Sequence, residues 1–299
     1  MPNGRLPEWI ESMAHSQDEF SRIVRRHQSE LTRGQRRVAD YMVRHFDDCA
    51  FHTSGQIGEH AGVSETTVIR LASTLGFSGF ADLQKFIRDG LVQSRIDRAS
   101  KSHSHVRNEA GVLAQVAQLD SENIQQTLSR VSPADLAQAA DMILSAPMIC
   151  TVGMRSSAAS ALYLTAALNQ LFGNAVSLSV SLGDQLDRLR SMPQGTVVIG
   201  VSFLRYSRYT FEVMRWSRKL GLRNIVITDS LTSPIAQFGD LLFLISTSSV
   251  HYLPSQAAAL SVINGLLGSI ALRGRKRVVA SLKRFEESLD DSDIFCERK

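Results

Sequence analysis

Two short runs of apolar residues at helical spacing meet between residues 54 and 75, across a turn too tight for an ordinary linker. Ile57 and Ala61 would turn inward from the first run. The second run has the i, i+3, i+4, i+7 pattern of one buried helix face, formed by Val68, Leu71, Ala72 and Leu75. Gly62 can adopt the positive φ that ends a helix, the small Gly58 lets two helices cross, and Ser64 is a favourable N-cap. The pattern predicts a helix-turn-helix.

The polar positions of the second helix lie opposite this apolar stripe and would face the double-stranded DNA of an operator. We predict that Arg70 reads a guanine in the major groove, while Thr66 and Ser73 make weaker contacts to bases or phosphates. Ser64 and Thr67, at the start of the helix, complete the predicted contact. The alternative for Arg70 is a solvated helix face, which the surrounding motif disfavours.

Positive charge is concentrated before the motif, although the whole chain has a formal net charge of only +4. Between residues 21 and 44 there are seven arginines and only two acidic residues, Glu30 and Asp40. We predict phosphate contacts for four basic residues of the first domain: Arg33, Arg36, Arg37 and Lys85. Each of them could equally be an ordinary surface charge.

Helical patterns on both sides of the motif supply apolar residues for a small core, among them Val38, Tyr41, Met42, Phe46, Leu83, Phe86 and Ile87. We predict a flexible tail over residues 1–19 and an all-helical DNA-binding domain over residues 20–96. Residues 97–129 are predicted to hold a linker and a connecting helix. His103 and His105 in this polar segment have no Cys or carboxylate partner at ligand spacing, so we expect neither a metal site nor a cofactor.

The cysteines are few and far apart, at positions 49, 150 and 296, which suits a reducing compartment without structural disulfides. The first residues contain no apolar stretch of signal-peptide length. We therefore expect a cytoplasmic location.

From Met148 onward, short apolar runs alternate with helical patterns. The five runs are MICTV (148–152), AVSLSV (175–180), TVVIGV (196–201), NIVIT (224–228) and LLFLIS (241–246). They predict a five-stranded parallel sheet with helices on both faces, over residues 130–275, followed by a carboxyl-terminal helix and tail over 276–299. The predicted fold class is thus α plus α/β. Two long stretches without charge, 156–183 and 241–272, are interpreted as buried elements rather than membrane spans.

Ligands of such sheets bind beyond the carboxyl ends of the strands, which directs attention to loops 153–157, 181–184, 202–210 and 228–233. Ser156 and Ser157 lie between a strand and a helix, where free backbone N–H groups and the helix dipole favour an anion. Helix capping is an equally good explanation for both serines. The same alternatives apply to the other hydroxyl residues at these strand ends, Ser202, Ser207 and Thr210.

Both halves of the chain resemble the RpiR-type bacterial transcriptional regulators, which join a helix-turn-helix domain to a sugar isomerase (SIS) domain. AGVSETTVIRLASTLGFSGFADLQ (61–84) is similar to the recognition-helix signature of that family. VGMRSSA (152–158) resembles its first ligand loop, VVIGVS (197–202) its central strand, and IVITDSLTSPIAQFGDLLFLI (225–245) its closing βαβ segment. The resemblance implies a SIS-like second domain and ligand-binding roles for Ser156 and Ser157. It also implies DNA binding controlled by a phosphosugar or related anionic sugar metabolite, in the regulation of carbohydrate catabolism.

The chain departs from this family after Ser202, where SIS domains usually carry a Ser-Gly-x-Thr-like turn. Residues 203–210 read FLRYSRYT, so hydroxyls are kept at Ser207 and Thr210 but the glycine is missing. Arg205 and Arg208 could pair with a phosphate or a carboxylate more strongly than hydroxyls and amides alone. Arg205 is therefore included among the predicted ligand-binding residues, and an acidic sugar is kept as a candidate effector.

A competing hypothesis is an aldose–ketose phosphate isomerase with an accessory DNA-binding domain. Isomerisation needs a base near the sugar carbon, and the candidates are Asp184 and His251, neither of which lies in a motif that singles it out. We therefore assign no catalytic residue and expect no enzyme activity. A third hypothesis is a scaffold or dimerisation module. Because small helix-turn-helix domains bind paired half-sites, we expect a homodimer or homotetramer formed through the second domain, and no membrane partner.

Overall fold

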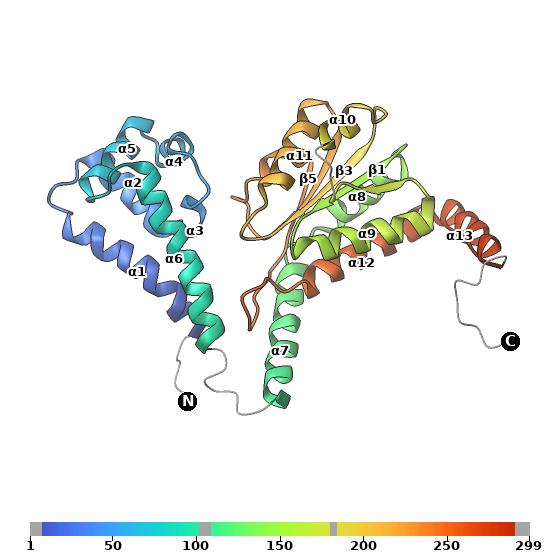
Figure 1. Ribbon diagram of the computed structural model, residues 1–299, viewed down its shortest axis with the longest axis horizontal. Coiled ribbons are helices and arrows are strands. Elements are labelled where there is room, and N and C mark those ends of the chain that lie inside the picture. Colours follow the sequence, from blue (N-terminus) through green and yellow to red (C-terminus); the bar gives the residue numbers. More distant parts are fainter. Residues whose placement is uncertain (1–7, 102–108, 180–183, 291–299) are drawn as a thin grey trace. The chain divides into compact units, whose positions relative to one another are not determined.

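The computed structural model describes residues 8–101, 109–179 and 184–290, and the chain divides into two compact units. The first consists mainly of the helices up to α6, and the second of a parallel sheet with the helices that cover it (Figure 1). Helix α7 (Glu109–Leu128) contains the division between them. The predicted fold class, a helical domain followed by a five-stranded parallel-sheet α/β domain, is confirmed.

The first unit is built from α1 (Glu8–Arg26), α2 (Arg33–Arg44), α3 (Phe46–Cys49), α4 (Ser54–Ala61), α5 (Glu65–Thr74) and α6 (Phe80–Lys101). Helices α4 and α5 form the helix-turn-helix expected from the sequence. The apolar positions that the spacing placed inside are buried, namely Ile57, Ala61, Val68, Leu71, Ala72 and Leu75. The part of the core that α4 and α5 contribute therefore follows from periodicity.

Two helices extend beyond the boundaries expected from the sequence. Helix α1 begins at Glu8, within the residues 1–19 that were predicted as a tail. Phe20 is fully buried and α1 packs against α6, so this helix is a core element of the unit. Helix α6 continues to Lys101, so the domain boundary predicted at residue 96 falls inside a helix.

The turn between α4 and α5 brings two backbone segments into direct contact. Gly62 ends α4 with a φ of 64°, in the left-handed region, and the N–H of Val63 donates to the carbonyl of Gly58 at 2.8 Å. A Cβ on Gly58 would lie 2.9 Å from the carbonyl oxygen of Val63. Position 58 therefore requires a residue without a side chain.

Gln35 ties the start of α2 to the end of α5. Its side-chain oxygen accepts from the N–H of Thr32 at 2.9 Å, while its own N–H donates to the hydroxyl of Thr32 at 3.3 Å, which completes a capping box. The amide nitrogen of the same side chain donates to the hydroxyl of Thr74 at 2.8 Å. A single buried glutamine thus caps one helix and anchors another.

The second unit contains one parallel sheet with the strand order β2-β1-β3-β4-β5. Its strands are β1 (Ile149–Gly153), β2 (Ala175–Ser177), β3 (Val197–Ser202), β4 (Arg223–Thr228) and β5 (Leu241–Leu244). In the register, Gly153 pairs with Val201 and Ser202 pairs with Thr228. The carboxyl ends of β1, β3 and β4 therefore meet at one edge of the sheet.

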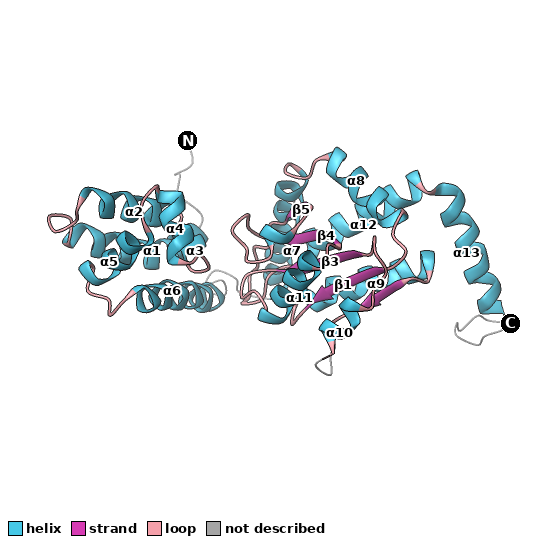
Figure 2. Cartoon of the chain, turned by 90° about the horizontal axis from the view of Figure 1, so that it is seen from above, coloured by secondary structure: helices cyan, strands magenta, loops and turns pink. Residues whose placement is uncertain are grey.

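Alternate strand residues feed two hydrophobic cores, one on each face of the sheet. Val197 and Ile199 pack with residues of α8 (Pro133–Leu144), α9 (Ser157–Phe172) and α12 (Ala257–Arg273). Val198 packs with residues of α10 (Gln185–Arg190) and α11 (Arg208–Lys219). Figure 2 shows α8 and α12 on one side of the strands and α10 and α11 on the other. A short helix η1 (Ala236–Phe238) precedes β5, and α13 (Arg275–Asp290) follows α12.

Helix α12, which carries no charge before Arg273, buries one face in the sheet core through Ala258, Ala259, Val262, Ile263, Leu266 and Ile270. Within the described ranges, no single helix has the length and apolar composition to cross a membrane. Helix α12 and residues 275–287 meet that criterion only as a pair, bent by 104°.

We expect Gly58→Ala to destabilise the first unit by about 1–3 kcal/mol, because the new methyl group would press on the backbone of Val63 and overpacking costs energies of that size. Calorimetric melting of the full chain measures the loss. Hydrogen exchange of the α4 and α5 amides shows whether the loss is local to the motif.

Gly55→Ala is the matched control, since both glycines lie in α4. A Cβ on Gly55 would make ordinary contacts, at 3.8 Å from the hydroxyl of Thr53 and 3.9 Å from Glu65. Alanine is the better helix former, so this variant should be neutral or more stable by up to about 1 kcal/mol. Equal destabilisation by the two variants would contradict the close-contact explanation.

Candidate functional site: a recognition helix and a strand-end crevice

The outer face of α5 presents Thr66, Ile69, Arg70 and Ser73, which are all exposed and follow the i, i+3, i+4, i+7 spacing of one stripe. Three of them are the residues that the sequence predicted to face DNA. Ile69 was not predicted, although its side chain is 43% exposed. Its position could have predicted this exposure, because residue 69 is three places after Thr66 and adjoins Arg70 on the polar face.

The start of α5 is held by packing, since its N-cap side chain makes no capping hydrogen bond. Ser64 occupies the N-cap position without a side-chain bond to the backbone, and its hydroxyl lies 3.0 Å from the hydroxyl of Thr67. The methyl group of Thr67 lies close to Gly34 of α2, where a Cβ would meet it at 3.2 Å. Thr67 is accordingly half-buried, whereas Ser64 is exposed.

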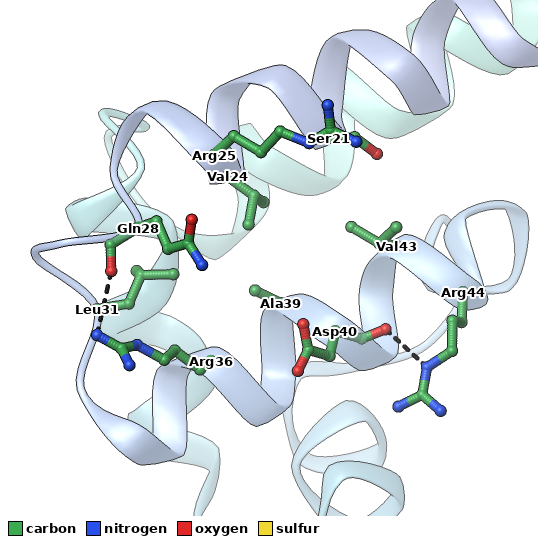
Figure 3. Close-up of a pocket in the computed structure, with 10 residues that line it drawn as sticks. All are labelled: Ser21, Val24, Arg25, Gln28, Leu31, Arg36, Ala39, Asp40, Val43 and Arg44. Carbon is green, nitrogen blue, oxygen red and sulfur yellow. Dashed lines mark hydrogen bonds between the residues drawn. The ribbon is translucent and has the colours of Figure 1, made fainter.

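The four predicted phosphate-binding residues are all exposed but lie in different environments: Arg33, Arg36, Arg37 and Lys85. The guanidinium of Arg37 lies over Gly62 at the turn before α5. Arg36 instead lines an open groove of about 580 Å³ between α1 and α2, and donates to the carbonyl of Gln28 at 3.3 Å (Figure 3). Arg37 is therefore the arginine of α2 that lies at the turn.

A group of aromatic and imidazole side chains links α2 with the segment around α4. The hydroxyl of Tyr41 lies 2.8 Å from Nδ1 of His60, and the ring of His60 lies 5.0 Å from that of His52. Burial raises the pKa of Tyr41 to about 12 and lowers the pKa of His52, with the nearby His60 lowering the latter further. Both groups are therefore held in their neutral forms near pH 7.

The second candidate site lies where the strand order of the sheet reverses. The chain leaves β1 towards β2 on one side and leaves β3 towards β4 on the other, so a crevice is expected between the loops after β1 and β3. The first loop is tight: a Cβ on Gly153 would lie 2.6 Å from the carbonyl oxygen of Ser157. This close approach starts α9 directly after the strand.

The predicted ligand hydroxyls differ in what they do within the fold. Ser156 occupies the N-cap position of α9, but its side chain makes no capping hydrogen bond. Helix capping, which was the alternative to ligand binding for this serine, is therefore not seen. Ser207 does cap α11, accepting from the N–H of Thr210 at 3.5 Å. Ser157 and Ser202 are buried. Thr210 is fully buried, and its hydroxyl has no hydrogen-bond partner among the described residues.

The loop after β3 is held by a carboxylate that sequence reasoning did not single out. Asp229, directly after β4, accepts from the N–H of Leu204 and from the hydroxyl of Tyr206, each at 2.8 Å. Arg205 lies between these two residues and has a φ of 70°. Arg155 in the loop after β1 has a φ of 55° and was not singled out either. Both arginines are exposed.

The other predicted positions contribute less. In the loop after β2, residues 181–183 lie outside the described part of the chain, and Asp184 immediately precedes α10. His251 is exposed in the segment between β5 and α12. His103 and His105 also lie outside the described ranges. Among the residues that are described, no group of three His, Cys, Asp or Glu side chains could hold a metal ion.

Comparison with known proteins assigns both units. Residues 19–94 match the helix-turn-helix domain of the rpiR family, and residues 142–267 match the SIS domain. The chain is 25% identical over 270 residues to the HTH-type transcriptional regulator HexR of Escherichia coli (strain K12), a match that covers 88% of this chain and 91% of that protein.

Two solved structures extend the comparison. The sugar isomerase domain of an RpiR transcription factor from Sphaerobacter thermophilus is 31% identical, with a TM-score of 0.57, over 59% of this chain and 98% of that domain. The NanR protein of Vibrio vulnificus, solved in complex with ManNAc-6P, has the same overall fold with a TM-score of 0.67 and 18% identity, over 91% of this chain and 100% of that one. The resemblance inferred from the motifs is confirmed, and the chain belongs to the RpiR family of transcriptional regulators, with a helix-turn-helix domain followed by a SIS domain.

Proposed function

We propose that this regulator binds an operator through α5 and that a phosphosugar or related anionic sugar metabolite, bound at the strand-end crevice of the SIS domain, controls its DNA affinity. The observation that carries the effector site is the set of unused polar groups at one sheet edge. The hydroxyl of Thr210 is buried without a partner, and Ser156 stands at a helix start without capping it. Buried polar groups are normally satisfied, so a ligand that accepts and donates hydrogen bonds suits this edge.

In the DNA complex, Arg70 reads a guanine and Thr66 and Ser73 make weaker contacts. Ile69 adds an apolar contact, for which the methyl group of thymine is the natural partner in the major groove. Ser64 and Thr67 lie at the end of α5 that approaches the bases. The phosphate contacts come from Arg33, Arg36, Arg37 and Lys85.

Regulation requires that the effector favour one arrangement of the DNA-binding domains over another. A homodimer or homotetramer formed through the SIS domain would present paired recognition helices to paired half-sites. Effector binding would then change the population of arrangements that fit the operator, a coupling typically worth about 1–3 kcal/mol. Control of genes for carbohydrate catabolism is the role that fits such an effector.

We further propose that the protein is not an isomerase. The curated relatives that it resembles are transcriptional regulators, and neither candidate base, Asp184 or His251, lies in the two loops that bound the crevice. A base must come within hydrogen-bond reach of the proton that it removes. Turnover of a phosphorylated aldose or ketose by the purified full chain, with retained DNA binding, would contradict this proposal.

We expect Arg70→Ala to weaken operator binding by about 1–3 kcal/mol and to change the preferred sequence, because a bidentate contact to guanine discriminates among bases. Selection of bound sequences from random DNA, followed by titration of the selected site, measures both effects. Arg37→Ala is the comparison. It should weaken all sequences alike and reduce the slope of log K against log salt concentration by about one, as expected for a lost phosphate contact. Uniform weakening by Arg70→Ala would disprove its role as a base reader.

For the effector site, we expect Ser156→Ala combined with Ser202→Ala to abolish the effect of the metabolite on DNA affinity while leaving unliganded DNA binding intact. A thermal-shift panel of phosphorylated and acidic sugars, including ManNAc-6P, first identifies a ligand, because binding to the folded form raises the melting temperature. Ser191→Ala, at an exposed serine after α10, is the control and should leave the response unchanged. A response retained by the double variant would mean that the pocket is elsewhere.

A further inference from the structure

Two residues at the edge of the sheet adopt a backbone conformation that is unfavourable for their type. Among the described residues, Arg155 and Arg205 are the two that have a positive φ without being glycine. A side chain with a Cβ disfavours this region, and arginine has no local hydrogen bond that would compensate. Residues held in such conformations concentrate at functional sites, where the surrounding structure over-determines them.

The two arginines lie in the two loops that bound the expected crevice. Arg155 follows β1 by two residues, and Arg205 follows β3 by three. These strands are neighbours in the sheet and flank the point at which the strand order reverses, where ligands of open α/β sheets bind. The strained positions therefore coincide with the predicted binding position.

Both guanidinium groups are available for an anion. Each side chain is exposed, and neither has a hydrogen bond or an ion pair within the described residues. Arg208, in the same segment as Arg205, differs because its guanidinium lies 3.9 Å from the carboxylate of Glu212. The partnerless hydroxyl of Thr210 lies in the first turn of the helix that follows Arg205. The two loops thus carry two exposed arginines without an ion pair among the described residues, and a buried hydroxyl without a partner follows the second of them.

The structure also explains how Arg205 is kept in its unfavourable conformation. The carboxylate of Asp229 binds the residue before it, through the N–H of Leu204, and the residue after it, through the hydroxyl of Tyr206. Both oxygens of Asp229 are engaged in this way, one by each donor. The carboxylate therefore shapes the loop on both sides of the arginine.

We propose that Arg155 and Arg205 form a clamp that binds the phosphate dianion of the effector from two sides, with Asp229 and Tyr206 positioning Arg205. The guanidinium fork matches phosphate oxygens in a bidentate manner, and two such groups balance the charge of a phosphate monoester dianion. This inference rests on the proposed effector site and adds to it the residues that select a phosphorylated sugar over a neutral one. The clamp takes the place of the glycine turn that this chain lacks.

The test is isothermal titration of the full-length protein with inorganic phosphate, glucose 6-phosphate, ManNAc-6P and unphosphorylated glucose, in chloride buffer of low ionic strength. Arg155→Gln and Arg205→Gln should each weaken binding of the phosphate-containing probes roughly tenfold to a hundredfold, as expected for lost bonds to a charged group. Arg190→Gln, at an exposed arginine of α10 that has no proposed role in binding, should leave the dissociation constant unchanged.

Arg205→Gly separates binding from folding. Glycine tolerates the positive φ, so this variant should raise the melting temperature of the unliganded protein while losing phosphate binding. A variant that is more stable but unable to bind cannot have lost binding through misfolding. Retained phosphate binding in Arg205→Gly would overturn the clamp.

The proposed role of Asp229 in positioning Arg205 can be tested separately with a double variant. Asp229→Asn should weaken phosphate binding in the wild-type background but cause no further loss in the Arg205→Gln background, because its effect passes through that arginine. Additive losses would overturn the positioning role.

Unchanged binding of a phosphorylated sugar by both Arg155→Gln and Arg205→Gln would disprove the clamp and leave the proposed function standing. Phosphate binding that depends on the two arginines, without any sugar phosphate altering DNA affinity, would support the clamp and contradict the proposed function. Wild-type protein that binds none of the phosphate-containing probes would refute the clamp.

Discussion

Each unit of this regulator is organised around a place where two backbone segments touch without room for a side chain. In the first unit, Gly58 of α4 lies against the carbonyl of Val63, and this contact sets how α5 leaves the turn. In the second unit, Gly153 at the end of β1 lies against the carbonyl of Ser157. That contact starts α9 immediately beyond the strand and so creates the short loop that holds Arg155 and Ser156. The geometry of both functional surfaces therefore depends on a missing Cβ.

The parts of the fold that could be predicted from the sequence are those determined by neighbouring residues. The helix-turn-helix follows from the spacing of residues such as Ile57, Val68 and Leu71, which turned out to be buried. The five strands follow from short apolar runs, since strands covered on both faces bury nearly every side chain. The extent of α1 did not follow, because its place in the core depends on packing against α6, which is distant in sequence.

The candidate site divides in the same way. Hydroxyl and basic residues at strand ends and on the recognition helix could be nominated from position alone. Asp229 could not, because its contacts with Leu204 and Tyr206 join segments 25 and 23 residues apart. Ile69 was missed for a different reason: the outward face was identified by its polar residues, so an apolar side chain exposed on that face was not considered. Backbone strain at Arg155 and Arg205 has no sequence signature at all, since φ is a property of the folded chain.

The bond between Gln35 and Thr74 has a consequence for how this domain can diverge. Gln35 serves two helices at once, through the capping box at Thr32 and through the hydroxyl of Thr74. Replacement of Thr74 alone would leave the amide nitrogen of the buried Gln35 without this partner, which is costly, whereas Thr74 would keep its bond to the carbonyl of Arg70 if Gln35 were replaced. Position 74 should therefore keep a hydrogen-bond acceptor wherever position 35 is glutamine. Under this constraint the recognition helix could acquire new outward residues while its angle to α2 is inherited unchanged.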